Sequence, residues 1–129
     1  MFPETPVLLD SESEGWTDEG CPACRDRPLP ILAADLEAAL DHGEFELHLQ
    51  PIVRLADDKI KGFEALARWQ RPGCGMVMPS DFVSVLEETG LIIPFGAWLV
   101  REACRILREW QCRHPAAEWL SLNINLSAC

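Results

Sequence analysis

The chain has 129 residues, of which 48% are hydrophobic and 25% are charged, a composition typical of a globular domain. Its formal net charge of −10 argues against binding to a nucleic-acid polymer or an anionic membrane surface, since both attract basic proteins. No apolar run reaches the roughly 18–20 residues of a membrane span. The first 13 residues carry no lysine or arginine, unlike a secretory signal. We therefore expect a cytoplasmic protein without a membrane span.

Residues 1–29 are expected to form an acidic leader that is mostly irregular or disordered, and 30–129 an ordered domain. The leader is rich in Pro and Gly and holds more than half of the excess negative charge. Its Cys21 and Cys24 form a C-x-x-C pair. A zinc site usually needs a second such pair, and none is present. We expect no function for these thiols, and half of a metal or redox site is the alternative.

A helix and a strand open the ordered region. Apolar residues three and four apart predict an amphipathic helix over 31–42 that ends before Gly43. Strict alternation from Phe45 then predicts a strand that ends near Pro51. A lone histidine is common on a strand, so His48 is interpreted as a strand residue and not as a ligand.

The second strand is predicted over 60–69, after a turn at residues 57–58. Pro and Gly residues predict a loop over 71–79. Ser80 is a favourable N-cap for a helix that runs from 81 to about 89.

A longer helix and a third strand complete the chain. Pro94 suits the first turn of a helix that reaches about residue 113, with apolar residues along one side. A third strand is predicted over 119–126. Strands and helices that alternate at these lengths indicate an α/β fold.

Polar side chains share one face of each predicted strand. Glu64 and Arg68 lie opposite the apolar face of the second strand, Asn125 lies opposite that of the third, and Gln50 belongs to the polar face of the first. One interpretation is an ordinary half-exposed sheet. The other is a barrel with helices outside and polar groups at its carboxyl-terminal mouth. Glu64 and Asn125 would then suit Mg²⁺ or Mn²⁺, and Arg68 a phosphate.

A series of motifs resembles the EAL family of cyclic di-GMP phosphodiesterases, in the family's order and spacing, over roughly residues 32–128. The tripeptide Glu64-Ala65-Leu66 alone would be weak, but it is one motif among many. The matching segments are Gln50-Pro51-Ile52-Val53, Gly62-Phe63-Glu64-Ala65-Leu66-Ala67-Arg68-Trp69, Arg71-Pro72-Gly73, Glu87-Glu88-Thr89-Gly90-Leu91-Ile92, Pro94-Phe95-Gly96 and Ile124-Asn125-Leu126-Ser127-Ala128.

The resemblance implies a TIM-like (β/α)8 barrel in which Mg²⁺ or Mn²⁺ promotes hydrolysis of cyclic di-GMP to linear pGpG. Glu64 matches the catalytic glutamate, which is a metal ligand, and Asn125 matches a second metal ligand. Gln50, Leu66 and Arg68 match positions that contact the dinucleotide. In that role the metal activates water and the site stabilises the charge that develops on the phosphate.

The chain is shorter than the barrel that the resemblance implies. Such a barrel needs about 250 residues, so 30–129 is expected to be the N-terminal portion of an EAL domain, truncated after about three strands. The family's later metal-binding acids, including a paired aspartate, have no counterpart here. We expect the chain alone to be inactive. A non-catalytic module that binds a protein partner, a second copy or the nucleotide is one alternative, and a gene fragment is another.

Overall fold

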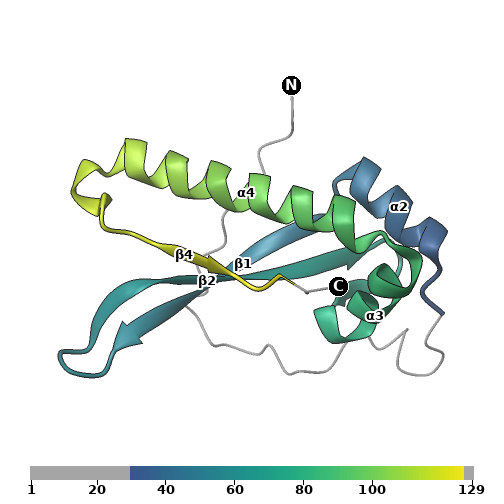
Figure 1. Cartoon of the computed structure of the whole chain (residues 1–129), viewed down its shortest axis with the longest axis horizontal. Helices are drawn as coiled ribbons and strands as arrows, with labels where there is room; N and C mark the ends of the chain where they lie inside the picture. Colours follow the sequence, from purple (N-terminus) through teal and green to yellow (C-terminus); the bar gives the residue numbers. More distant parts are fainter. Residues whose placement is uncertain (1–29, 127–129) are drawn as a thin grey trace.

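The computed structural model describes residues 30–126, so the predictions for the leader and for its cysteine pair lie outside the described residues. Helices and strands alternate along this region, which confirms the α/β class (Figure 1). The elements are α2 (Ala33–His42), β1 (Phe45–Arg54), β2 (Lys59–Arg71), β3 (Gly75–Val77), α3 (Pro79–Thr89), α4 (Ile92–Arg113), the short 3-10 helix η1 (Pro115–Ala117) and β4 (Leu122–Ile124).

Each of the three predicted α-helices forms within two residues of its expected start. In α2 the side chain of Asp35 accepts a hydrogen bond from the backbone N–H of Leu32, 3.2 Å away, and thereby caps the first turn. Gly43 ends the helix in the left-handed conformation, with φ 69°. In α3 the N-cap is Met78, not Ser80 as predicted, because Pro79 already occupies the first turn.

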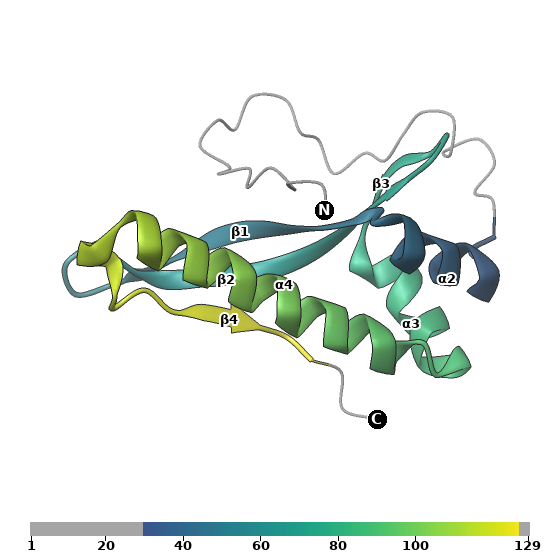
Figure 2. The same cartoon turned by 90° about the horizontal axis from the view of Figure 1, so that it is seen from above.

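The sheet is mixed. β1 and β2 are antiparallel, β3 adds antiparallel to β2, and β4 pairs with β2 in parallel. The sequence pattern assigned no strand direction, so the antiparallel β1–β2 hairpin is a finding of the structure. The described strands form an open sheet and not a closed barrel (Figure 2).

The strands differ in length from the predicted ones. β1 continues past Pro51 to Arg54. Within the described sheet β1 is an edge strand, so one of its sides faces solvent and has no strand partner. A proline whose missing N–H would point to that side removes no hydrogen bond between strands. The predicted loop over 71–79 contains β3, which doubles back on the end of β2 through Gly73 and Gly75, both with positive φ. The third strand shortens from 119–126 to the three residues of β4.

The apolar face of β1 and β2 is covered by helices, and α4 runs along the sheet (Figures 1 and 2). Phe45 lies at the centre of an aromatic cluster, with ring centroids 5.1 to 5.9 Å from those of its neighbours Trp69, Phe82, Phe95 and Trp98. Burial of rings of this size contributes most of the apolar stabilisation of a small core. The predicted packing of apolar strand faces against helices is therefore confirmed.

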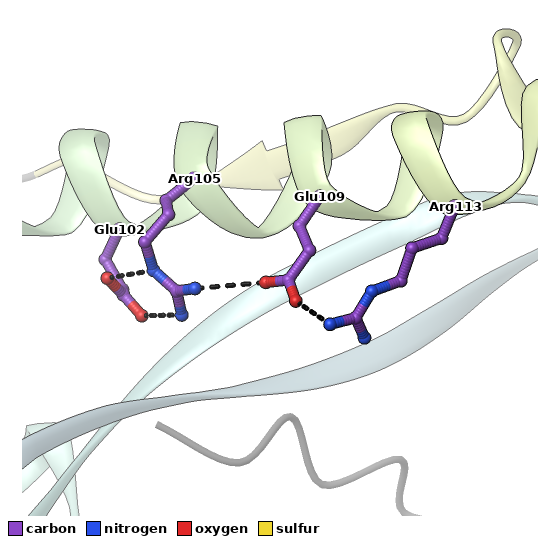
Figure 3. Close-up of polar contacts among 4 residues, drawn as sticks. All are labelled: Glu102, Arg105, Glu109 and Arg113. Atoms are coloured by element: carbon purple, nitrogen blue, oxygen red, sulfur yellow. Dashed lines mark hydrogen bonds and ion pairs between the residues drawn. The ribbon is translucent and has the colours of Figure 1, made fainter. Parts of the chain in front are cut away.

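A row of ion pairs runs along α4 (Figure 3). Arg105 donates to Glu102 at 2.7 Å and to Glu109 at 3.1 Å, and Arg113 pairs with Glu109 from the next turn. The hydrogen bond with Glu102 raises the pKa of Arg105, partial burial opposes this effect, and the charges of Glu102 and Glu109 reinforce it. These pairs form between residues three and four apart on α4, next to the apolar side that packs on the sheet.

Gly62 allows β2 to approach the segment that leads into β4. The backbone N–H of Phe63 donates to the carbonyl oxygen of Ser121 at 2.9 Å. A Cβ atom on residue 62 would lie only 2.7 Å from that same oxygen. The close pairing of β2 with β4 therefore requires a residue without a side chain at this position.

Candidate functional site

The candidate site lies on the polar face of the sheet, where β1, β2 and the end of β4 meet. Gln50 on β1 is the register partner of Glu64 on β2. The side-chain amide of Asn125, which follows β4, donates to Oε1 of Glu64 at 2.6 Å. The structure thus brings together three predicted site residues from three separate segments of the chain.

Leu66 and Arg68 continue this face along β2. Alternation places both on the same side as Glu64, and both are half-buried. Nη1 of Arg68 donates to the carbonyl oxygen of Ala67 at 2.9 Å. All five predicted positions therefore share one face. The three on β2, Glu64, Leu66 and Arg68, lie before its carboxyl end and not at it as expected, because the strand continues to Arg71.

Three polar residues that were not predicted as site residues extend the same face. Oε1 of Glu46 lies 2.8 Å from Nε2 of His48 and accepts a hydrogen bond of 2.8 Å from Nε2 of Gln70. Glu46 is the register partner of Arg68. The alternation that selected Gln50 also placed Glu46 and His48 on its face, so the pattern that could have identified them was present in the sequence.

A groove of about 850 Å³ borders the site on the side of α3 and α4. Leu66 and Asn125 line it at the sheet, and most of the remaining wall is apolar. The candidate site is therefore continuous with an apolar groove, and Leu66 belongs to both.

The side chains of Glu64 and Asn125 fit a hard divalent cation in their chemistry, because carboxylate and amide oxygens are the ligands that Mg²⁺ and Mn²⁺ prefer. Their contact brings both side chains close enough to share one ion. They supply two of the roughly six oxygens that such an ion binds. Among the described residues, no group of three or more His, Cys, Asp or Glu side chains could hold a metal.

Comparison with known proteins decides the family. The family model described as the EAL domain matches residues 33–129. The chain belongs to the EAL domain family.

Two similar proteins show how much of a relative's length the chain covers. An uncharacterized protein of Mycobacterium tuberculosis, Rv1357c, is 41% identical over 97 residues, which are 75% of this chain and 31% of that protein. The bifunctional diguanylate cyclase/cyclic di-GMP phosphodiesterase MucR of Pseudomonas aeruginosa is 40% identical over 97 residues, 14% of its length. The chain therefore spans a third or less of these relatives.

Solved EAL structures agree with the fold. The MucR phosphodiesterase in complex with c-di-GMP matches with a TM-score of 0.67 and 38% identity over 73% of this chain and 37% of that one. The EAL enzyme Bd1971, in a form with cAMP and cyclic di-GMP bound, matches with a TM-score of 0.66 and 35% identity over 71% of this chain and 26% of its own. This chain therefore corresponds to part of an EAL TIM-like barrel. Within residues 30–126, no helix is long and apolar enough to cross a bilayer.

Proposed function

We propose that this chain binds cyclic di-GMP on the polar face of its sheet, with Mg²⁺ or Mn²⁺ held by Glu64 and Asn125. The observation that carries the proposal is the 2.6 Å hydrogen bond between these two side chains, which are 61 residues apart in the sequence and lie beside Gln50. Two solved EAL relatives that match this chain are described as complexes with this nucleotide.

Each proposed contact follows from the chemistry of its side chain. The Arg68 guanidinium is a permanent cation with several N–H donors and suits a phosphate oxygen. The Gln50 amide can both donate to and accept from the polar groups of the nucleotide. Leu66 offers an apolar surface at the edge of the groove, where the face of a guanine base could pack.

We propose that 30–129 acts as the N-terminal portion of an EAL domain in the cytoplasm, behind the acidic leader 1–29, and that it does not hydrolyse cyclic di-GMP alone. Glu64 would be the catalytic glutamate, and a bound metal would supply activated water. Two protein oxygens leave a cation mostly hydrated, so these residues position nucleotide and metal without building a complete catalytic centre.

Isothermal titration calorimetry tests the binding proposal. The unaltered chain in Mg²⁺ is expected to bind cyclic di-GMP, and Arg68→Ala is expected to weaken binding at least tenfold. Arg108→Ala is the matched control, because it removes the same charge from an exposed position on α4. Equal weakening by both variants would show a general charge effect and would contradict the site. Chromatography of the same mixtures is expected to show no pGpG, and turnover at an enzymatic rate would contradict the proposed inactivity.

The second candidate is a non-catalytic interaction module that binds a protein partner or a second copy. The observation that favours it is the apolar groove, whose rim leaves Ile93 three-quarters exposed. Large exposed apolar surfaces of this kind mark interaction sites. Size-exclusion chromatography with light scattering separates a homodimer from a monomer.

A further inference from the structure

Two neighbours hold the carboxylate of Glu46 on the polar face of the sheet. Nε2 of Gln70, on β2, donates to Oε1 of Glu46 at 2.8 Å, and Nε2 of His48, two residues along β1, lies 2.8 Å from the same oxygen. The side chains of Glu46 and His48 are only 17% and 21% exposed. The carboxylate is therefore fixed in place, although the nucleotide site proposed above does not use it.

Both of these contacts involve Oε1 of Glu46 and not its second carboxylate oxygen, Oε2. Each oxygen of a carboxylate can accept more than one hydrogen bond. Within residues 30–126, the structure shows no hydrogen bond or ion pair to Oε2. Because the side chain is partly exposed, a ligand on this face can reach that oxygen. Glu46 therefore presents a fixed anionic acceptor that suits N–H donors.

Glu46 lies beside the two residues proposed to contact the nucleotide on β2. It is the register partner of Arg68, and its neighbour His48 is the register partner of Leu66. Residues that are diagonal neighbours on paired strands, as Leu66 and Glu46 are, lie about 7–8 Å apart, within reach of a long side chain or a flat ring. A base that packs against Leu66 can therefore turn its edge toward the carboxylate of Glu46.

The two purine bases differ at the edge that such an acceptor meets. Guanine carries N–H donors at both N1 and N2, whereas adenine carries one donor, the N6 amino group, next to an acceptor at N1. A carboxylate only accepts, so it matches the guanine edge and faces the N1 lone pair of adenine unfavourably. Hydrogen bonds to an ionised acceptor are about twice as strong as those between neutral groups. An anionic acceptor at this position thus favours guanine.

We infer that Glu46 recognises the guanine edge of the bound nucleotide and selects cyclic di-GMP over cyclic di-AMP. The inference rests on the proposed nucleotide site and adds a specificity-determining residue to it. Gln70 and His48 are positioning residues in this arrangement, since they hold Oε1 of Glu46 and leave Oε2 to the base.

Calorimetry with two nucleotides tests the inference. The unaltered chain in Mg²⁺ is expected to bind cyclic di-GMP at least tenfold more tightly than cyclic di-AMP. Glu46→Gln is expected to reduce this ratio of affinities at least tenfold, because an amide both donates and accepts and therefore matches adenine. Glu37→Gln is the matched control, since it removes the same charge from an exposed position on α2, and it should leave the ratio unchanged.

The ratio of the two affinities separates recognition from folding. A variant that is partly unfolded binds both nucleotides less tightly by the same factor, so its ratio does not change. An unchanged ratio in Glu46→Gln, or equal affinity of the unaltered chain for both nucleotides, would overturn the inference without contradicting the proposed function. No binding of either nucleotide by the unaltered chain would contradict both.

Discussion

Asn125 donates its side-chain amide to Glu64 at 2.6 Å, although the two residues are 61 positions apart in the sequence. The parallel pairing of β4 with β2 produces this contact, because Glu64 lies opposite Asn123 and the chain then continues along the same edge. Gln50 joins them from β1 through the antiparallel register. The candidate site therefore depends on both kinds of strand pairing, and a change that weakens either one should affect it.

Gly62→Ala should destabilise the chain by about 1–3 kcal/mol, because the added methyl group would press on the carbonyl oxygen of Ser121 and separate β4 from β2. Urea unfolding followed by circular dichroism measures the effect. Gly96→Ala is the matched control. It adds the same group within a helix where no atom lies within 4 Å, so it should be neutral or stabilise by up to about 1 kcal/mol. Equal changes in the free energy of unfolding for the two variants would contradict the close approach of Gly62 to Ser121.

Phe45→Ala should cost about 3–5 kcal/mol, because it removes the ring at the centre of the aromatic cluster and leaves a cavity. Leu55→Ala should change the free energy of unfolding by less than about 0.5 kcal/mol, because Leu55 is exposed. The near-ultraviolet circular dichroism of the tryptophans, which reports their packing, should be lost only in the Phe45 variant. A loss of less than about 1 kcal/mol in that variant would show that the cluster is not the core.

Glu109→Gln should lower stability by about 0.5–1 kcal/mol, because it removes the negative partner of both Arg105 and Arg113 on α4 (Figure 3). The difference from the unaltered chain should shrink in 1 M salt, which screens exposed ion pairs. The raised pKa of Arg105 adds stability that is lost only when the pH rises through that raised value. Titration of Arg105 itself should therefore cause no change between pH 6 and 9, and a salt-independent loss on substitution would contradict the ion-pair explanation.

The sequence predicted the shared face of the site residues because alternation along a strand depends only on the backbone pleat. Gln50, Glu64 and Asn125 each follow that period of two, so their common side could be read without knowing the topology. The same alternation is identical in parallel and antiparallel strands. The direction of β1 relative to β2 therefore could not be read from it.

Other features escaped prediction because they depend on tertiary pairing. β3 has only three residues and forms because β2 extends to Arg71 and offers an edge. Pro51 looked like a strand end, but the chain continues as an edge strand beyond it. His48 was interpreted as a plain strand residue, and its strand position is confirmed. Its contact with Glu46, however, became visible only in the structure.

The dependence of cyclic di-GMP binding on Glu64 tests the central claim most directly. Calorimetry with the unaltered chain and with Glu64→Gln, each in Mg²⁺ and in EDTA, compares four dissociation constants. We predict that Mg²⁺ strengthens binding to the unaltered chain and that Glu64→Gln weakens binding at least tenfold in Mg²⁺, while the two proteins bind alike in EDTA. Equal affinity of both proteins in Mg²⁺, or no binding by the unaltered chain, would contradict a metal-assisted nucleotide site at Glu64 and Asn125.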